Sequence, residues 1–150
     1  MTVARPFRTL RLDHIVLRVA DLDRALGFYR DILGLSVERT LPDLGLTQLR
    51  AGDSLIDLVT LDSTLGRQGG AGPGVGGRNQ DHFCLRIDPF YPDALIDYLV
   101  GNGVSADPSG IADRYGADGT GPSIYIHDPD GNTVELKGPP VTGPLTAKET

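Results

Sequence analysis

Apolar and polar residues alternate along residues 12–20, LDHIVLRVA, and this alternation predicts a β-strand. Ile15, Leu17 and Val19 form its apolar row, which we expect to face the core. His14 and Arg18 then lie on the opposite face of the same strand.

A helical pattern follows over residues 22–33, where apolar side chains recur every three or four positions. Asp21 suits the N-cap of this helix, and Gly34 suits the left-handed position that follows a helix end. Three further strands are predicted at 35–41, 46–52 and 54–61, with turns at 42–43 and 52–53. The first half of the chain is therefore expected to fold as β-α-β-β-β.

The opening pattern returns in residues 80–88, QDHFCLRID, 68 positions after its first occurrence. A helix at 91–100 follows, packing through Leu95, Tyr98 and Leu99. We then expect a weak strand and turn at 103–110, a loop at 114–121, and a hairpin at 121–137 that turns at 128–131, DPDG.

The second half thus repeats the first, and the chain is predicted to be an α+β protein with two βαβββ modules in tandem around one site. A single domain is expected at 11–138, with modules at about 11–61 and 80–138. Residues 1–10 and 139–150 lack apolar periodicity and are expected to be flexible tails.

Residues 62–80 between the modules are rich in glycine and contain a formal GxGxxG at 72–77. A dinucleotide-binding turn would follow a strand directly and open a helix, whereas this segment leads into a strand and carries Pro73. No Lys-Ser/Thr pair follows, so it is not a phosphate-binding P-loop. We interpret the segment as a flexible loop.

The composition narrows the possible partners. With 14 Lys and Arg against 20 Asp and Glu, the net charge of −6 argues against nucleic acid. Cys84 is the single cysteine, which fits a reducing compartment. Neither a signal peptide nor an apolar run long enough for a membrane span is present, so a cytoplasmic protein without a membrane partner is expected.

Four polar residues occupy equivalent strand positions in the two modules. His14 and His82 stand in the repeated strand, and Asp57 and Glu135 stand in the last strand of each half. A carboxylate flanked by apolar residues is costly to bury unless it is paired or bound to a cation. If the modules pair by pseudo-twofold symmetry, the four side chains converge and suit a divalent Zn, Ni, Co, Mn or Fe(II) ion.

Other roles remain open for these residues. Either histidine alone can be a core or surface residue, Asp57 can pair with Arg50, and Glu135 can pair with Arg18 or Arg86. The two arginines can equally bind an anionic group of the substrate.

The neighbouring polar residues have separate expectations. Asp13 and Asp81 are expected to point away from the site, as turn or edge residues. His127 is expected to be an exposed polar residue at a strand end. Cys84 is expected to serve packing, with lining of the cavity as the alternative.

The segments LDHIVLRVADLDRALGFYRDILGL (12–35) and IHDPDGNTVEL (126–136) resemble the vicinal oxygen chelate superfamily, and are most similar to glyoxalase I-like proteins. The superfamily also includes extradiol dioxygenases, methylmalonyl-CoA epimerase, and the fosfomycin- and bleomycin-resistance proteins. The resemblance covers about residues 11–138. It implies a cupped sheet around one metal ion, often shared within a homodimer.

The glyoxalase I ligand pattern falls on His14, Asp57, His82 and Glu135, and Arg18 matches a substrate-binding position. The pattern departs at Asp57 and at Leu61, where glyoxalase I has Glu and Asn. The resemblance implies a metal-dependent lyase or isomerase acting on a small substrate with vicinal oxygens, with Glu135 and Asp57 as catalytic bases. An Fe(II) extradiol dioxygenase, a thiol transferase of the fosfomycin-resistance type and a non-catalytic ligand-binding resistance protein are the alternatives.

Overall fold

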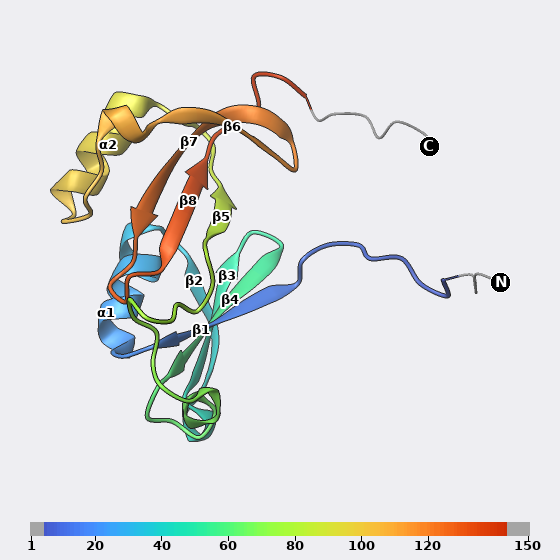
Figure 1. The fold of residues 1–150 in the computed structure, drawn as a ribbon, viewed down its shortest axis with the longest axis vertical. Helices are drawn as coiled ribbons and strands as arrows, with labels where there is room; N and C mark the ends of the chain where they lie inside the picture. Colours follow the sequence, from blue (N-terminus) through green and yellow to red (C-terminus); the bar gives the residue numbers. More distant parts are fainter. Residues whose placement is uncertain (1–4, 144–150) are drawn as a thin grey trace.

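The structure is a computed structural model that describes residues 5–143. Two four-stranded sheets lie one above the other in Figure 1, each formed by one half of the chain. The strand orders, β1-β4-β3-β2 and β5-β8-β7-β6, are the same arrangement repeated. The predicted α+β fold of two βαβββ modules is thereby confirmed. None of the helices within the described range is long and apolar enough to cross a membrane.

The first module follows the predicted order closely. Its elements are β1 (His14–Val19), α1 (Leu22–Leu26), β2 (Ser36–Leu41), β3 (Leu46–Ala51) and β4 (Ser54–Thr60). The Asp21 carboxylate accepts a hydrogen bond from the Arg24 amide at 2.9 Å, as expected of an N-cap. The helix continues beyond α1 as a π-helical segment (Gly27–Ile32), and Gly34 follows it with a φ of +79°.

The second module contains β5 (Phe83–Arg86), α2 (Pro92–Gly101), β6 (Ala112–Gly116), β7 (Gly119–His127) and β8 (Thr133–Lys137). The predicted 121–137 hairpin is confirmed. Two expectations are wrong: residues 103–110 form no strand, and residues 114–121, expected as a loop, belong to the β6–β7 hairpin. Glycines at 116, 119 and 121 hide this hairpin, because they lower β propensity where the two strands meet.

Helix α2 packs through Leu95 and Leu99, as expected, but the third predicted residue, Tyr98, lies at the surface. Ile96 and Leu99 are its buried residues, whereas Tyr98 is half exposed and its hydroxyl donates to the Ile32 carbonyl oxygen at 2.7 Å. Tyr98 therefore joins the two modules at the surface. It does not fill the core.

The modules share one hydrophobic core, in which Phe28 and Tyr29 of the first module meet Phe83 of the second. The rings of Tyr29 and Phe83 are stacked with centroids 6.4 Å apart, and those of Tyr29 and Phe28 meet edge to face at 4.9 Å. The apolar rows of β1 and β5 face this core, as their alternation predicted.

A second connection is polar and centres on Asp128, at the turn between β7 and β8. Its buried carboxylate accepts the Tyr29 hydroxyl at 2.6 Å, two backbone amides of its own turn, and the Asn132 side-chain amide at 2.7 Å. In the same turn, Asp130 accepts the Ala20 amide at 2.8 Å. The turn of the second module is thus bonded to the first, and fixes how the two sheets sit together.

Burial, together with the charge of Asp128, raises the pKa of Tyr29 well above its ordinary value, so this hydroxyl stays a donor across the physiological range. We expect Tyr29→Phe to lower the free energy of unfolding by about 1.5–3 kcal/mol, the range for a hydrogen bond to a charged group. Urea denaturation measures the change. Tyr98→Phe, which removes a bond to a neutral and more exposed carbonyl, is the matched control, and an equal loss in both variants would contradict the special role of Asp128.

Candidate metal centre

His14 and Asp57 lie on the same face of the first sheet, opposite the apolar row. The parallel register places Val16 of β1 beside Asp57 of β4, and His14 beside Leu55. Residues paired in register share a face, so His14 and Asp57 are diagonal neighbours. The Asp13 hydrogen bond and then the charge of Asp57 raise the pKa of His14 above its usual value.

The Asp57 carboxylate is buried, with 4 % of the residue exposed, and is only half satisfied. Its Oδ2 accepts a hydrogen bond from Gln48 Nε2 at 2.9 Å, while Oδ1 has no hydrogen-bond partner within the described part of the chain. A buried, unpaired carboxylate oxygen is costly unless a cation meets it. Asp57 does not pair with Arg50, which is bound to Glu38 at 3.0 Å.

His82 and Glu135 form the matching pair on the second sheet. Glu135 is 7 % exposed, and its Oε2 lies 3.5 Å from His82 Nε2. The register places Cys84 and Tyr125 on either side of Glu135, and the Tyr125 ring meets the His82 ring edge to face at 5.2 Å. Glu135 makes no ion pair with Arg18 or Arg86 in the described structure.

Each histidine is held by the aspartate that precedes it. His14 Nδ1 is 2.7 Å from Asp13 Oδ1, and His82 Nδ1 is 2.5 Å from Asp81 Oδ2. Asp13 and Asp81 are exposed, as expected of edge residues, but each carboxylate contacts its histidine, so the expectation that they point away from the site is wrong. A carboxylate on Nδ1 fixes the imidazole tautomer and leaves Nε2 for a metal ion, as is usual around metal-ligating histidines.

One chain presents these four residues as two His-carboxylate pairs. Within residues 5–143, no group of three or more His, Cys, Asp or Glu side chains lies close enough together to hold a metal ion. Each pair sits at an edge of its sheet, because β1 and β5 are the edge strands. The donor types and the unsatisfied oxygen of Asp57 fit a divalent cation once the two edges meet.

Arg18 and Arg86 occupy equivalent positions and each binds a loop. Arg18 donates to the carbonyl oxygens of Gly70 and Ala71 at 3.0 and 3.1 Å, and Arg86 donates to Asp118 at 3.1 Å. Both side chains, expected to bind substrate, already have partners within the protein.

The glycine-rich segment 62–80 is held by these contacts and is more ordered than a flexible linker. It contains a short 3-10 helix (Gly66–Gly69), and a Cβ atom at Gly69 would lie 2.4 Å from the Arg18 guanidinium. The segment opens no long helix and leads into β5, as expected if it is not a dinucleotide-binding turn.

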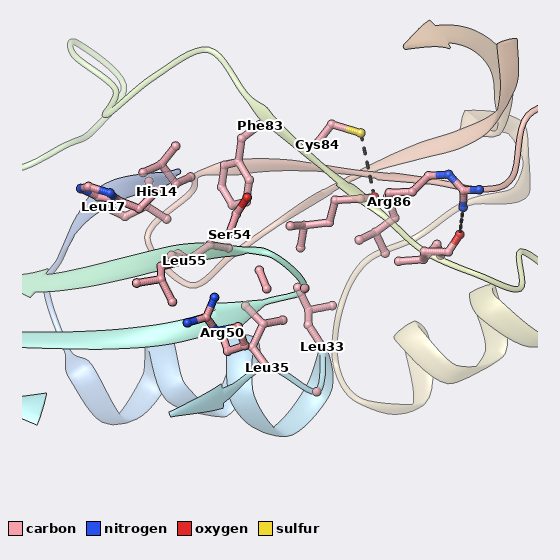
Figure 2. A pocket seen from close by; sticks show the side chains of 18 of the residues that line it. His14, Leu17, Leu33, Leu35, Arg50, Ser54, Leu55, Phe83, Cys84 and Arg86 are labelled. Atoms are coloured by element: carbon pink, nitrogen blue, oxygen red, sulfur yellow. Dashed lines mark hydrogen bonds between the residues drawn. The ribbon is translucent and has the colours of Figure 1, made fainter. Parts of the chain in front are cut away.

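An apolar cleft of about 1040 Å³ opens between the modules and is lined by residues from both faces of β1 and β5. Figure 2 shows β5 passing over the first sheet, with Phe83 pointing into the cleft from above and Leu55 and Leu35 below it. His14 and His82 line it, whereas Asp57 and Glu135 do not. The candidate metal centre is assigned to the strand faces that carry these two carboxylates.

Two tandem βαβββ modules with the same strand order define the class of protein to which this fold belongs. The family model of the Glyoxalase/Bleomycin resistance protein/Dioxygenase superfamily matches residues 11–136, and the chain belongs to this superfamily.

Relatives of known sequence agree with this assignment. The chain is 28 % identical to a probable lactoylglutathione lyase of Vibrio cholerae, over 84 % of this chain and 88 % of that protein. It is 30 % identical to the virulence protein STM3117 of Salmonella typhimurium, over 84 % and 82 % of the two chains.

Solved structures have the same fold. An integron cassette protein from the mobile metagenome of Vibrio cholerae superposes with a TM-score of 0.66 and 28 % identity, covering 88 % of this chain and 97 % of that one. The Salmonella typhimurium virulence protein superposes with a TM-score of 0.67 and 26 % identity, covering 89 % and 99 %.

The structure also shows partners that the sequence analysis missed. Gln48 lies in β3 beside Asp57 of β4, and Arg39 of β2 lies beside Gln48. In the sequence, Gln48 is recognisable only as a polar residue between Thr47 and Leu49. Its position beside Asp57 follows from the strand register, which the sequence alone does not show. His127 is exposed, as expected.

Cys84 does not serve packing; it follows the alternative expectation, because it is accessible, lines the cleft and lies beside Glu135. Burial of the thiol, reinforced by the charge of Glu135, raises its pKa from 9.0 to about 11. In metal-free folded protein at pH 8 we expect iodoacetamide to modify Cys84 about 100-fold more slowly than in urea-unfolded chain, because the thiolate is the reactive form. The single cysteine makes the mass-spectrometric reading unambiguous, and equal rates would contradict the shift.

Proposed function

We propose that the protein is a divalent-metal-dependent lyase or isomerase of the glyoxalase type, acting on a small substrate with two neighbouring oxygens. The observation that carries the proposal is the matched pair of half-sites, in which a histidine bound at Nδ1 by the preceding aspartate stands by a buried carboxylate. The lactoylglutathione lyase name of the Vibrio cholerae relative supports the same reaction class.

His14, Asp57, His82 and Glu135 would hold the ion, which would be Zn, Ni, Co, Mn or Fe(II). When bound, such an ion would polarise the two substrate oxygens and make the hydrogen on the carbon between them more acidic. With four ligands from the protein, the ion would still have room to bind the two substrate oxygens.

Glu135 is the base we assign to the proton transfer. Its carboxylate would take the proton from one substrate carbon and return it to the neighbouring carbon, so the net change is an isomerisation with no proton lost. Its burial beneath Tyr125 and Cys84 keeps bulk water from competing for that proton. Asp57, the second carboxylate, is held on one oxygen by Gln48 and is the more firmly fixed of the two.

The complete site would form between two copies of the chain. A twofold dimer that places the β1 edge of one chain against the β5 edge of the other brings His14 and Asp57 to the partner's second half-site. The apolar cleft between the modules, with Val16 and Leu12 exposed nearby, offers surface that a second copy would bury.

Purified protein loaded with Ni, Zn, Mn or Fe(II) is expected to retain about one ion per chain by elemental analysis, and His14→Ala is expected to lose it. Mixing His14→Ala with His82→Ala chains, after unfolding and refolding together, should restore about a quarter of the wild-type metal content, because only heterodimers of the proposed geometry contain one intact site. No recovery would contradict the cross-chain arrangement, and no metal in wild-type protein would contradict the function itself.

For the reaction, Glu135→Gln is expected to lower kcat by about 100- to 10,000-fold, the usual contribution of a positioned base, while the fold is kept. Hemithioacetals of a 2-oxoaldehyde with glutathione and with smaller thiols serve as substrates, since the identity of the thiol is open. Asp97→Asn, which changes an exposed carboxylate on α2 to an amide, is the control for replacing a carboxylate by an amide elsewhere in the protein. Full activity in the Glu135 variant would contradict the assignment of the base.

A further inference from the structure

We infer that Gln48, itself held by Arg39, is a positioning residue that leaves Asp57 a single free oxygen for the metal ion. The inference rests on the proposed function, because it concerns how Asp57 acts as a ligand. It starts from the four-strand order, in which Arg39, Gln48 and Asp57 lie side by side on β2, β3 and β4.

The direction of the amide is fixed by its neighbours. Arg39 Nε donates to Gln48 Oε1, and a guanidinium has no acceptor atom. The other end of the amide must therefore be its NH₂ group, which donates to Asp57 Oδ2 at 2.9 Å. Gln48 is 9 % exposed, so little water competes for either bond.

This arrangement assigns different roles to the two Asp57 oxygens. Oδ2 is occupied by Gln48, whereas Oδ1 is buried and has no partner within residues 5–143. A ligand held in this way binds through one oxygen and pays little ordering entropy, because its rotamer is already fixed by the amide. The shorter side chain of Asp, compared with Glu, suits a carboxylate that is held on one side.

The neutral charge of Gln48 matters as much as its position. An arginine bound directly to Asp57 would neutralise the carboxylate and compete with a cation. Two arginines lie close by on the same face, but each is directed elsewhere: Arg39 to the amide oxygen, and Arg50 to Glu38. The register between β2 and β3 shifts between Val37 and Arg39. Glu38, which binds Arg50, lies at this shift, and Arg39, which binds Gln48, follows directly after it.

The decisive measurement is metal affinity, obtained by competition of Zn or Ni between the full-length protein and a chromogenic chelator. Gln48→Leu keeps the size of the side chain and removes the bond, and we expect it to weaken binding by about 10- to 100-fold, as loss of an outer-shell partner usually does. Gln48→Asn keeps the amide but shortens its reach, and we expect a loss in the same range. Gln68→Leu, at an exposed position, is the matched control and should bind as the wild type does.

A double-mutant cycle separates positioning from a general effect on the fold. If Gln48 acts through Asp57, Gln48→Leu should cause no further loss of affinity in an Asp57→Ala background. A full additional loss there, or unchanged affinity in both Gln48 variants, would overturn the inference while leaving the metal-dependent function intact. Wild-type protein that binds no metal would overturn both. Urea unfolding of each variant confirms that the comparison is made between folded proteins.

Discussion

The arrangement of the two modules depends on one buried carboxylate. Asp128 gathers donors from its own turn and the Tyr29 hydroxyl from the helix of the other module. A charge in a protein interior is tolerated only when its acceptor capacity is filled, so this turn has a strong preference for one docking geometry. Packing of Phe28, Tyr29 and Phe83 buries apolar surface between the modules, and the hydrogen bonds of Asp128 fix the relative orientation of the modules.

That fixed geometry determines what one chain can offer chemically. The apolar rows of β1 and β5 are committed to the shared core, so the polar rows carrying the histidines face outward at two separate sheet edges. The same commitment leaves each His-carboxylate pair supported but incomplete. Asp13, Asp81 and Gln48 contact the pairs within the chain, and in the dimer that we propose the partner copy would complete each site.

The sequence predicted the features that depend on local periodicity. Strand alternation, the Asp21 cap, Gly34 and the DPDG turn all appear where their residues indicated. The β6–β7 hairpin was missed because its glycines obscure the alternation. The partners of Arg18, Asp57 and Asp13 could not be predicted, since they depend on cross-strand register, loop paths and side-chain rotamers that no single segment encodes.

Arg18 and Arg86 are equivalent in the strand repeat, but they hold non-equivalent loops: Arg18 binds the segment between the modules, and Arg86 binds the β6–β7 turn. A lone module would already carry a histidine on its edge strand and a carboxylate on the strand beside it. Two identical lone modules that met edge to edge would present two histidines and two carboxylates. Gene duplication and fusion of such a half-length ancestor would then have given the tandem chain its two matched His-carboxylate pairs, with a symmetry that first existed between separate molecules.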